Sequence, residues 1–405
     1  MKVCLASVHP RMLSGQIDSL VGLGRELSRL GHQVRLVTAF PTSELLDPRR
    51  GERDGDSARM PTLLTRVCRT LARAMEAARE ADVLHLNLPT PAFGLLADLA
   101  QSRVGVPVVV GFEAHLASPG DLVRRLAESP GFYLPRLLVN NRLLARISRH
   151  RCATYVVSSR FQEAELVSVG IPRDRIAAIP NLFDVSRFGT RQPMAAARST
   201  LGLPAGRIVT YVGHYNPVKG VDVLIEAFPR VLQACPDARL VLAWSGLGAA
   251  RPVRAAIDRL DLRERIIQLG RVDVACLLAA SDVAVLPYRL SIGQAAFPGL
   301  LFEAMAVGTP LVTTDLPLLR ELVQPGRTAL VVRPEDPASL ADAVVQLLNA
   351  PAQAEGMIAH QRAQMATRFE PERLARRYEN VYLHAIQLAT GEARVLQPIR
   401  GNPAV

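Results

Sequence analysis

Residues 283–321 combine glycines, prolines and a glutamate in a pattern that can form a binding site for a phosphorylated ligand. A short apolar run is followed by a Gly/Pro-rich loop that contains Gly299, and an apolar helical pattern then covers 301–307 until Gly308 ends it. A loop that opens onto a helix N-terminus offers backbone N–H groups and the positive end of the helix dipole, which favour phosphate. Glu303, expected in the first helical turn, could accept hydrogen bonds from a ribose diol. The segment therefore predicts a nucleotide site, the alternative being a glycine turn with a helix-capping Glu.

The run from Glu303 to Pro310, Glu-Ala-Met-Ala-Val-Gly-Thr-Pro, resembles half of the signature of the family-4 retaining glycosyltransferases, which have the GT-B architecture. In the full signature another glutamate precedes this run, and its position is Ala295 here. A subset of the family carries Phe-Pro-x-x-x-(Phe/Tyr)-Glu instead, and the run from Phe297 to Glu303 is similar to that variant. A lysine is common in the variant where this chain has Leu300. The resemblance identifies the family and leaves the sugar pocket open.

The run from Lys219 to Phe228 closely resembles a second family motif, Lys-Gly-x-x-x-Leu-Ile-x-Ala-Phe. In the family this lysine and an arginine that precedes it grip the donor diphosphate, and the position of the arginine is His214 here. A cation beside the diphosphate stabilises the negative charge that develops as the glycosidic bond breaks. Lys219 can supply this charge, and His214 can do so while it is protonated. A surface role for Lys219 is the alternative.

The resemblance also implies donor contacts made through the backbone. The residues expected at the phosphates are Phe297, Gly299, Leu300 and Leu301. Pro298, in the same loop, lacks an N–H. Gly270-Arg271-Val272 resembles a family Gly-x-Val turn whose backbone reads the nucleobase, so Arg271 and Val272 belong to the predicted donor site.

Residues near two strand ends in the first half are candidates for the acceptor side. Ser14-Gly15 stands where the family usually has a Gly-Gly pair near the donor phosphates and the acceptor. In the run 106–115, the family position of a His near the reacting sugar falls on Glu113, and His115 follows shortly. Either residue could take that catalytic position, and a helix-capping or solvent role for both is the alternative.

A dinucleotide-binding Rossmann unit is the obvious competitor for the first turn. That unit needs a G-x-G-x-x-G turn after the first strand and an acid at the end of the second strand. The turn at 9–15 lacks this glycine pattern, and the second strand runs Val34-Arg-Leu-Val-Thr38. The sequence therefore argues against a dinucleotide cofactor, and the family resemblance implies no cofactor beyond the nucleotide-sugar substrate.

The candidate residues are positioned by alternating strand-like and helix-like runs. Strands are expected at 3–8, 34–37, 83–88, 106–110, 154–157, 176–179, 208–213, 240–243, 266–269, 283–286 and 311–313, and helices at 16–30, 62–80, 251–260, 301–307, 337–350 and 371–390. Such alternation predicts an α/β fold with parallel sheets that helices cover on both faces. Ligands of these sheets lie at the carboxyl ends of the strands, where the candidates fall.

The length of 405 residues indicates two domains of about 200 residues each. Ile179-Pro-Asn-Leu-Phe-Asp184 resembles the family motif at the crossing between domains. We therefore predict an N-terminal Rossmann-like acceptor-binding domain over 1–185 and a C-terminal Rossmann-like nucleotide-sugar-binding domain over 186–370, with a cleft between them as in GT-B proteins. A helix over 371–390 should return to the first domain, and 391–405 should form a tail.

The composition excludes several classes of protein. The chain is 49% hydrophobic and 21% charged, and its five cysteines are scattered, which argues for a reducing compartment and against a disulfide framework or a zinc site. No run approaches 18 apolar residues, so no membrane span is expected. The net charge of +11 comes almost entirely from arginine, but the motifs typical of nucleic-acid-binding proteins are missing.

The segment 121–151 carries seven arginines among regularly spaced leucines. Such a basic amphipathic segment can rest on an anionic membrane, although a solvated helix face beside a core stripe explains it equally well. The expected location is therefore the cytoplasm, with peripheral contact to the cytoplasmic face of the inner membrane as an open alternative.

These observations together favour a metal-independent, retaining glycosyltransferase that moves a sugar from a nucleotide diphosphate to a hydroxyl of a glycan, a lipid-linked or a natural-product acceptor. Two alternatives stay open. Ala295, Ser14 and Leu182 depart from the family pattern, which suits a pseudo-glycosidic coupling enzyme with an altered sugar site. A degenerate member that acts as a non-catalytic binding partner is the other, and the presence of both Lys219 and Glu303 argues against it.

Overall fold

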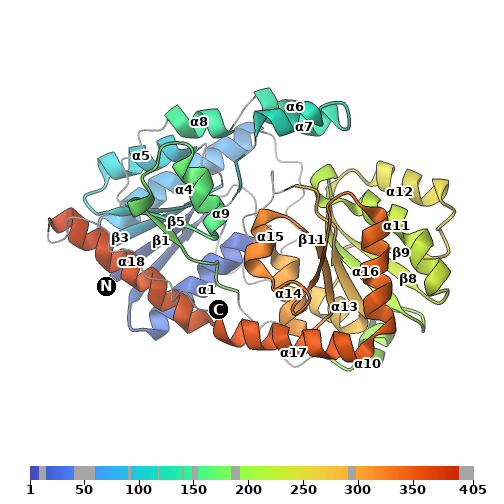
Figure 1. Ribbon diagram of the computed structural model, residues 1–405. Helices are drawn as coiled ribbons and strands as arrows, with labels where there is room; N and C mark the ends of the chain where they lie inside the picture. Colours follow the sequence, from blue (N-terminus) through green and yellow to red (C-terminus); the bar gives the residue numbers. More distant parts are fainter. Residues whose placement is uncertain are drawn as a thin grey trace. The chain divides into compact units, whose positions relative to one another are not determined.

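The structure, a computed structural model, describes residues 1–8, 15–40, 60–89, 93–112, 114–116, 118–138, 141–147, 154–183, 192–290 and 298–391. The chain divides into two units, each with its own parallel sheet (Figure 1). Unit 1 takes its described residues from Met1–Asp184 and Phe369–Val405, and unit 2 from Val185–Ser291 and Pro298–Arg368. The first and the last described residues, Met1 and Gly391, therefore both belong to unit 1.

Unit 1 is built on a six-stranded sheet with the order β2-β1-β3-β4-β5-β6, and every neighbouring pair is parallel. The strands are β1 (Lys2–Ser7), β2 (Gln33–Thr38), β3 (Val83–Leu88), β4 (Val108–Phe112), β5 (Thr154–Val157) and β6 (Ile176–Ala178). All but the first residue of β1 are buried, because helices cover both faces of the sheet. Alternate residues of each strand consequently enter two separate cores.

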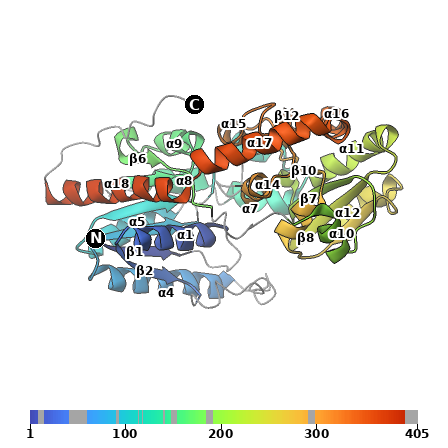
Figure 2. The same cartoon turned by 90° about the horizontal axis from the view of Figure 1, so that it is seen from below.

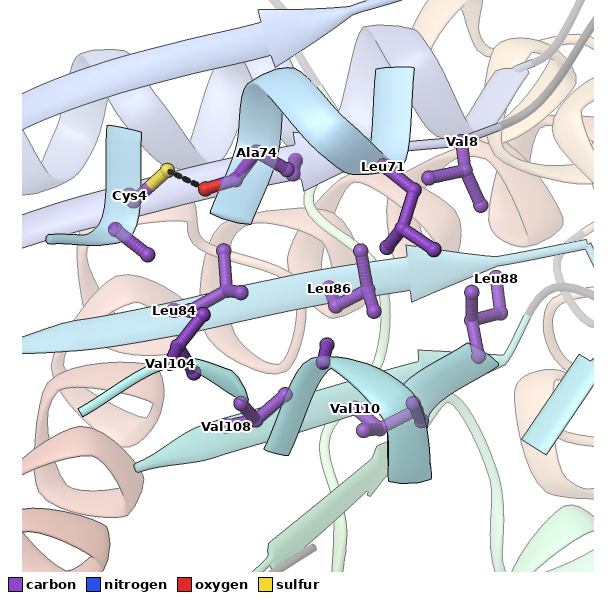
Figure 3. Close-up of a cluster of buried hydrophobic side chains, with 14 of the residues drawn as sticks. Cys4, Val8, Leu71, Ala74, Leu84, Leu86, Leu88, Val104, Val108 and Val110 are labelled. Carbon is purple, nitrogen blue, oxygen red and sulfur yellow. Dashed lines mark hydrogen bonds between the residues drawn. The ribbon is translucent and has the colours of Figure 1, made fainter. Parts of the chain in front are cut away.

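One core lies between the sheet and two helices, α4 (Met60–Ala78) and α5 (Gly94–Arg103). Figure 3 shows its side chains: Leu84 and Leu86 point from β3, Val108 and Val110 from β4, and Leu71 from α4. The thiol of Cys4 contacts the carbonyl oxygen of Ala74 at 3.9 Å. Burial raises the pKa of this thiol to about 11, so Cys4 behaves as a small apolar residue.

The opposite face of the sheet is covered by α1 (Gly15–Arg29) and by the last helix of the chain, α18 (Pro371–Thr390). The two helices pack on each other and lie side by side in Figure 2. His32, just after α1, is hydrogen-bonded through Nε2 to a carboxylate oxygen of Glu379 on α18 at 2.9 Å. The α18 helix is thus part of the core of unit 1.

Unit 2 repeats the plan with the strand order β12-β11-β10-β7-β8-β9, again parallel throughout. The strands are β7 (Ile208–Tyr215), β8 (Arg239–Gly248), β9 (Ile266–Leu269), β10 (Val283–Leu286), β11 (Leu311–Thr314) and β12 (Leu330–Val332). The helices are α10 (Met194–Thr200), α11 (Val221–Ala234), α12 (Ala250–Arg259), α13 (Val274–Ala280), α14 (Gly299–Val307), α15 (Pro317–Leu322), α16 (Pro337–Asn349) and α17 (Pro351–Thr367). The predicted α/β class with two parallel sheets is therefore confirmed.

The basic segment 121–151 differs from its prediction as one amphipathic stretch. It forms three short helices, α6 (Pro119–Arg124), α7 (Pro130–Leu138) and α8 (Asn141–Ile147). Pro130 lies at the start of α7, where a proline is tolerated because the first N–H groups of a helix have no intrahelical acceptor. Among the described residues, no helix is both long enough and apolar enough to cross a membrane.

Candidate active site

The sheet of unit 2 reverses its strand order between β7 and β10, which are neighbours although β8 and β9 separate them in sequence. Ligands of open α/β sheets bind outside the carboxyl ends of the strands at such a reversal. His214 and Lys219 come from the end of β7 and the turn after it, and Tyr288 follows β10. The topology therefore brings the predicted cations to the edge where a ligand is expected.

Lys219 is the last residue of a 3₁₀ turn, η4 (Pro217–Lys219), that leads into α11. The next residue, Gly220, has φ +66°, in the left-handed region that suits glycine. A Cβ on Gly220 would lie 1.9 Å from the carbonyl oxygen of Pro287, so the backbones after β7 and β10 are in direct contact. This approach fixes where the Lys219 side chain begins.

Arg289 ties the same two segments together. Its backbone N–H donates to the carbonyl of Val218 at 2.9 Å, and its Nη1 donates to the carbonyl of Pro217 at 3.0 Å. Its guanidinium also pairs with Asp222 of α11 at 2.5 Å and with Glu335 at 3.1 Å. The turn that carries Lys219 is thus held by one side chain from the loop after β10.

The ammonium of Lys219 lies over the ring of Tyr288, with Nζ 4.0 Å from the ring centroid. Burial lowers the pKa of Lys219 to about 7, so a modest change in its surroundings decides its charge near neutral pH. Lys219 is also one of only two lysines in the sequence, the other being Lys2. Almost all other basic side chains of this sequence are arginines, whose charge does not respond to burial. Lys219 therefore places at this site a compact ammonium whose pKa does respond.

Glu303 is the fifth residue of α14, so its prediction in the first helical turn was wrong. Its side chain nevertheless reaches back toward the helix start, because a Cβ on Gly299 would lie 3.8 Å from Glu303 Oε1. Burial raises the pKa of the Tyr288 phenol, and the negative charge of Glu303 raises it further. Glu303 and Lys219 therefore approach the same tyrosine from different elements.

The N-terminus of α14 presents backbone groups more than side chains. Leu300 is 7% exposed and Leu301 is fully buried, so both side chains belong to the core. The N–H of Leu301 donates to the carbonyl of Pro298 at 3.0 Å. The first N–H groups of a helix have no intrahelical acceptor, which leaves those of Gly299 and Leu300 as the candidates for phosphate. Phe297 lies outside the described residues.

His214, Ser245 and Arg271 form the other side of this edge. His214 Nδ1 is 2.5 Å from Ser245 Oγ, and Arg271 Nε donates to the carbonyl oxygen of Ser245 at 3.1 Å. Ser245 Oγ also accepts from the N–H of Leu247 at 3.3 Å, which orients the hydroxyl toward His214. Arg271 is exposed and the neighbouring Val272 is half-buried.

Ser245, Tyr288 and Arg289 are site residues that the sequence analysis missed. Each acts through a contact with a segment distant in sequence: His214 and Ser245 are 31 residues apart, and Asp222 and Arg289 are 67 apart. The Ser-Gly-Leu-Gly run that ends β8 was the available signal for Ser245. For Tyr288 the signal was its position directly after a strand that ends in Leu286-Pro287.

The structure describes two of the four acceptor-side candidates, Gly15 and His115. Gly15 is the first residue of α1, one residue before the expected start of that helix, whereas Ser14 and Glu113 lie outside the described residues. The fourth, His115, is 1% exposed, and its Nδ1 is 2.7 Å from Glu165 Oε2. Glu165 also accepts from the N–H of Leu116 at 3.1 Å. This arrangement fixes His115 in a buried position, and its expected place near the reacting sugar stays a prediction.

His85, at the reversal between β1 and β3, borders a small cavity in unit 1. The cavity holds about 20 Å³, room for roughly one or two waters, and the polar residues Ser19, Asn87, Ser158 and Asn181 line it. His85 Nδ1 is 2.6 Å from the hydroxyl of Tyr382 on α18, and its ring stacks on Tyr378. Burial lowers the pKa of His85 to about 4, so the imidazole is neutral near pH 7.

Among the described residues, no group of three or more His, Cys, Asp or Glu side chains is arranged to hold a metal ion. The positive charge of the candidate site in unit 2 comes from Lys219 and Arg271. Arg289 adds a third cation, which is paired with Asp222 and binds the turn that carries Lys219.

Comparisons with known protein families match both halves of the chain. Residues 14–187 match the family described as "Glycosyltransferase Family 4", and residues 206–350 match "Glycosyl transferases group 1". The chain is 32% identical over 276 residues to a phosphatidyl-myo-inositol mannosyltransferase of Mycobacterium tuberculosis, which covers 66% of this chain and 64% of the relative. The match thus spans less than two thirds of that relative's length.

Other relatives match over more of their length. A D-inositol 3-phosphate glycosyltransferase of Thermobispora bispora is 28% identical over 374 residues, covering 88% of this chain and 81% of the relative. An N-acetyl-alpha-D-glucosaminyl L-malate synthase of Bacillus anthracis is 26% identical over 309 residues, covering 76% and 75%.

Solved structures confirm the predicted GT-B fold. A sucrose-phosphate synthase from Thermosynechococcus elongatus superposes with a TM-score of 0.72 at 22% identity, covering 96% of this chain and all of that chain. The Anabaena protein HepE in complex with UDP superposes with a TM-score of 0.70 at 18% identity, covering 95% of this chain and all of that chain.

Proposed function

Because this chain belongs to the family-4 glycosyltransferases, we propose that it transfers a sugar from a nucleotide diphosphate to an acceptor hydroxyl with retention of the anomeric configuration. The observation that carries the proposal is the meeting of Lys219 and Glu303 at Tyr288, at the strand reversal of unit 2. One cation and one carboxylate at a helix N-terminus suit the diphosphate and the ribose of one nucleotide.

In the proposed reaction, the bond between the anomeric carbon and the donor phosphate oxygen breaks as the acceptor oxygen attaches to the same face of the sugar. Lys219 stabilises the charge that collects on the leaving diphosphate, and His214, oriented by Ser245, donates to the same group. The N–H groups of Gly299 and Leu300 add two more donors. The leaving phosphate takes the acceptor proton, so the proposal requires neither a protein base nor a metal ion.

The nucleoside part of the donor would lie between Glu303 and the turn at Arg271 and Val272. A carboxylate accepts two hydrogen bonds from a ribose diol, and a turn backbone can pair with a base edge.

The acceptor side concerns unit 1, where we propose that α6, α7 and α8 contact a membrane that carries a lipid-linked acceptor. Four apolar side chains of these helices, which are 41% to 74% exposed, stand beside Arg124 and Arg146. The four are Val123, Leu134, Leu138 and Leu143. Apolar side chains flanked by arginines suit an anionic interface. Scattered cysteines favour a reducing compartment, hence the cytoplasmic face.

A thermal-shift panel of UDP, GDP, ADP and dTDP, with their sugars and with EDTA present, tests the proposal. A ligand at about 100 times its dissociation constant stabilises the folded state by about 2.7 kcal/mol, which such an assay resolves. We expect one diphosphate to stabilise the protein and Lys219→Ala to abolish the shift. No shift with any diphosphate would contradict the proposal and favour a non-catalytic family member.

A further inference from the structure

We propose that Tyr288 is a positioning residue of the donor site, whose ring seats the Lys219 ammonium where the donor diphosphate meets it. The inference rests on the proposed function, and it concerns a residue outside both family motifs. Lys219 supplies the charge, and Tyr288 determines where that charge is held and when it is present.

The ring of Tyr288 is a rigid support. Tyr288 is 5% exposed, and its backbone carbonyl accepts a hydrogen bond of 2.6 Å from Thr314 Oγ1 on the neighbouring strand β11. The residues on both sides of it are also fixed, because the carbonyl of Pro287 packs on Gly220 and Arg289 binds the η4 turn. The segment Pro287–Arg289 therefore contacts Lys219 at both ends. Pro287 and Arg289 contact the backbone of the turn that carries Lys219, and the Tyr288 ring contacts its ammonium.

An aromatic face suits this task better than a carboxylate does. The face of a ring attracts an ammonium within about 6 Å, and the attraction grows when the ammonium is removed from water. A carboxylate in the same place would neutralise Lys219 and compete with an anionic substrate. The carboxylates of Asp222 and Glu335 are instead paired with Arg289.

The ring also helps decide the charge of Lys219 near neutral pH. Burial lowers the pKa of Lys219 to about 7, and the ring face favours the charged form against that burial. The other titratable and charged groups around this pair are Tyr211, His214, Asp222, Arg289, Glu303 and Glu335. Loss of the ring should therefore lower the pKa of Lys219 further and leave a smaller charged fraction at neutral pH.

The first test observes the ammonium in the unaltered protein. Because Lys2 and Lys219 are the only lysines, selective labelling with [¹³C,¹⁵N]lysine gives two sets of signals, which Lys219→Met assigns. We expect the Hε signals of Lys219 to be shifted upfield by the ring current and to titrate near pH 7. Ordinary Hε shifts together with titration of Lys219 near pH 10 would overturn the inference.

The second test measures UDP, GDP, ADP and dTDP binding by calorimetry between pH 6 and 9. We expect Tyr288→Met, which removes the aromatic face, to weaken the tightest of these by about 10-fold at pH 7.5 and to move the pH midpoint of binding downward. Tyr288→Phe, which keeps the face, should restore both. Phe228→Leu, in the buried part of α11, is the control for lost packing and should leave the midpoint in place.

The outcomes separate this inference from the proposed function. If none of the four diphosphates binds the wild type, the proposed function fails, and the lysine signals still test the ring seat. If a diphosphate binds and depends on Lys219 but Tyr288→Met keeps the wild-type affinity and midpoint, only the role of Tyr288 is wrong. If Tyr288→Met does not fold, the lysine signals of the wild type decide alone.

Discussion

The buried ammonium of Lys219 makes activity and folding stability compete. An unfolded chain holds this lysine near its ordinary pKa of 10.5, whereas the folded protein holds it at about 7. Between these values the unfolded state binds more protons, so the folded state becomes more stable as the pH rises through this range. Below about pH 7 the cost of burying the charge is present in full.

We therefore expect Lys219→Met to lower transfer by about 100-fold or more while it raises the free energy of unfolding. The gain should be largest near pH 6 and should shrink toward pH 10, where wild-type Lys219 is neutral. Urea unfolding at both pH values, with turnover measured in parallel, provides the comparison. Equal stability of the two proteins at pH 6 would show that Lys219 is well solvated.

Glu303 gives a prediction about the ribose. If its carboxylate accepts hydrogen bonds from the diol, Glu303→Gln should weaken nucleoside diphosphate binding by about 10-fold or more, because hydrogen bonds to charged groups are the stronger ones. Affinity for a 2′,3′-dideoxy analogue should change little. Calorimetry with both ligands checks this, and an equal loss with both would place Glu303 elsewhere.

Sequence motifs predicted the residues proposed to bind the donor. They did not predict the residues that fix those side chains in place. Lys219 and Glu303 could be predicted because each stands in a run of local sequence with a recognisable pattern. Arg289 could not, since its role depends on Asp222 and on a turn that only the adjacency of β7 and β10 brings near. The contact between His115 and Glu165 could not be predicted either, because the two residues are 50 positions apart in the sequence.

Secondary structure was easier to predict where the apolar period is regular. Strands buried on both faces and helices such as α1 and α16 begin and end close to the expected residues. Asp336 caps α16 by accepting a hydrogen bond from the N–H of Ser339 at 3.0 Å. The α17 helix was missed because its few large apolar residues have no helical period. Periodicity gives the elements, while close backbone contacts depend on tertiary packing.

The turn between η4 and α11 offers a test of such a contact. Gly220→Ala adds a methyl group 1.9 Å from the Pro287 carbonyl oxygen at φ +66°, so the two backbones must separate. We expect a loss of about 3 kcal/mol or more in unfolding free energy, together with weaker diphosphate binding. Gly326→Ala is the matched control, because Gly326 has φ +75° and open space around its Cβ. Similar losses in both variants would mean that strain alone matters.

His85, which is hydrogen-bonded to Tyr382 on α18, gives a prediction on how folding stability depends on pH. The folded protein holds the pKa of His85 at about 4, below its ordinary 6.5, so the unfolded chain takes up this proton first as the pH falls. Stability should therefore decline between pH 6.5 and 4, by up to about 3 kcal/mol. Chemical unfolding at pH 7 and 4.5 measures the decline. His85→Gln, which keeps a hydrogen-bonding group for Tyr382, should flatten it, and an unchanged slope would exclude His85 as its cause.

The charge of the whole molecule bears on the proposed membrane contact. A chain with a net charge of +11 binds anionic surfaces without specificity, so the specific part must come from the apolar residues of α6 to α8. We expect co-sedimentation with phosphatidylglycerol vesicles that 0.5 M salt reduces, and little with phosphatidylcholine. Leu138→Ser with Leu143→Ser should weaken it, whereas Leu383→Ser on α18 should not. Equal effects of these variants would exclude the proposed surface.

Because α18 is the last helix of the chain but packs on the first sheet, unit 1 can complete its core only at the end of translation. The ribosome completes the strands β1 to β6 long before it makes Pro371–Thr390, so one face of the first sheet waits for its cover while all of unit 2 is translated. Nascent unit 1 therefore exposes residues of β3 and β4 that α18 covers, such as Val83 and Val109, for most of the translation time, and chaperones should bind it during that interval. A premature stop after unit 2 would damage the half of the protein that was made first.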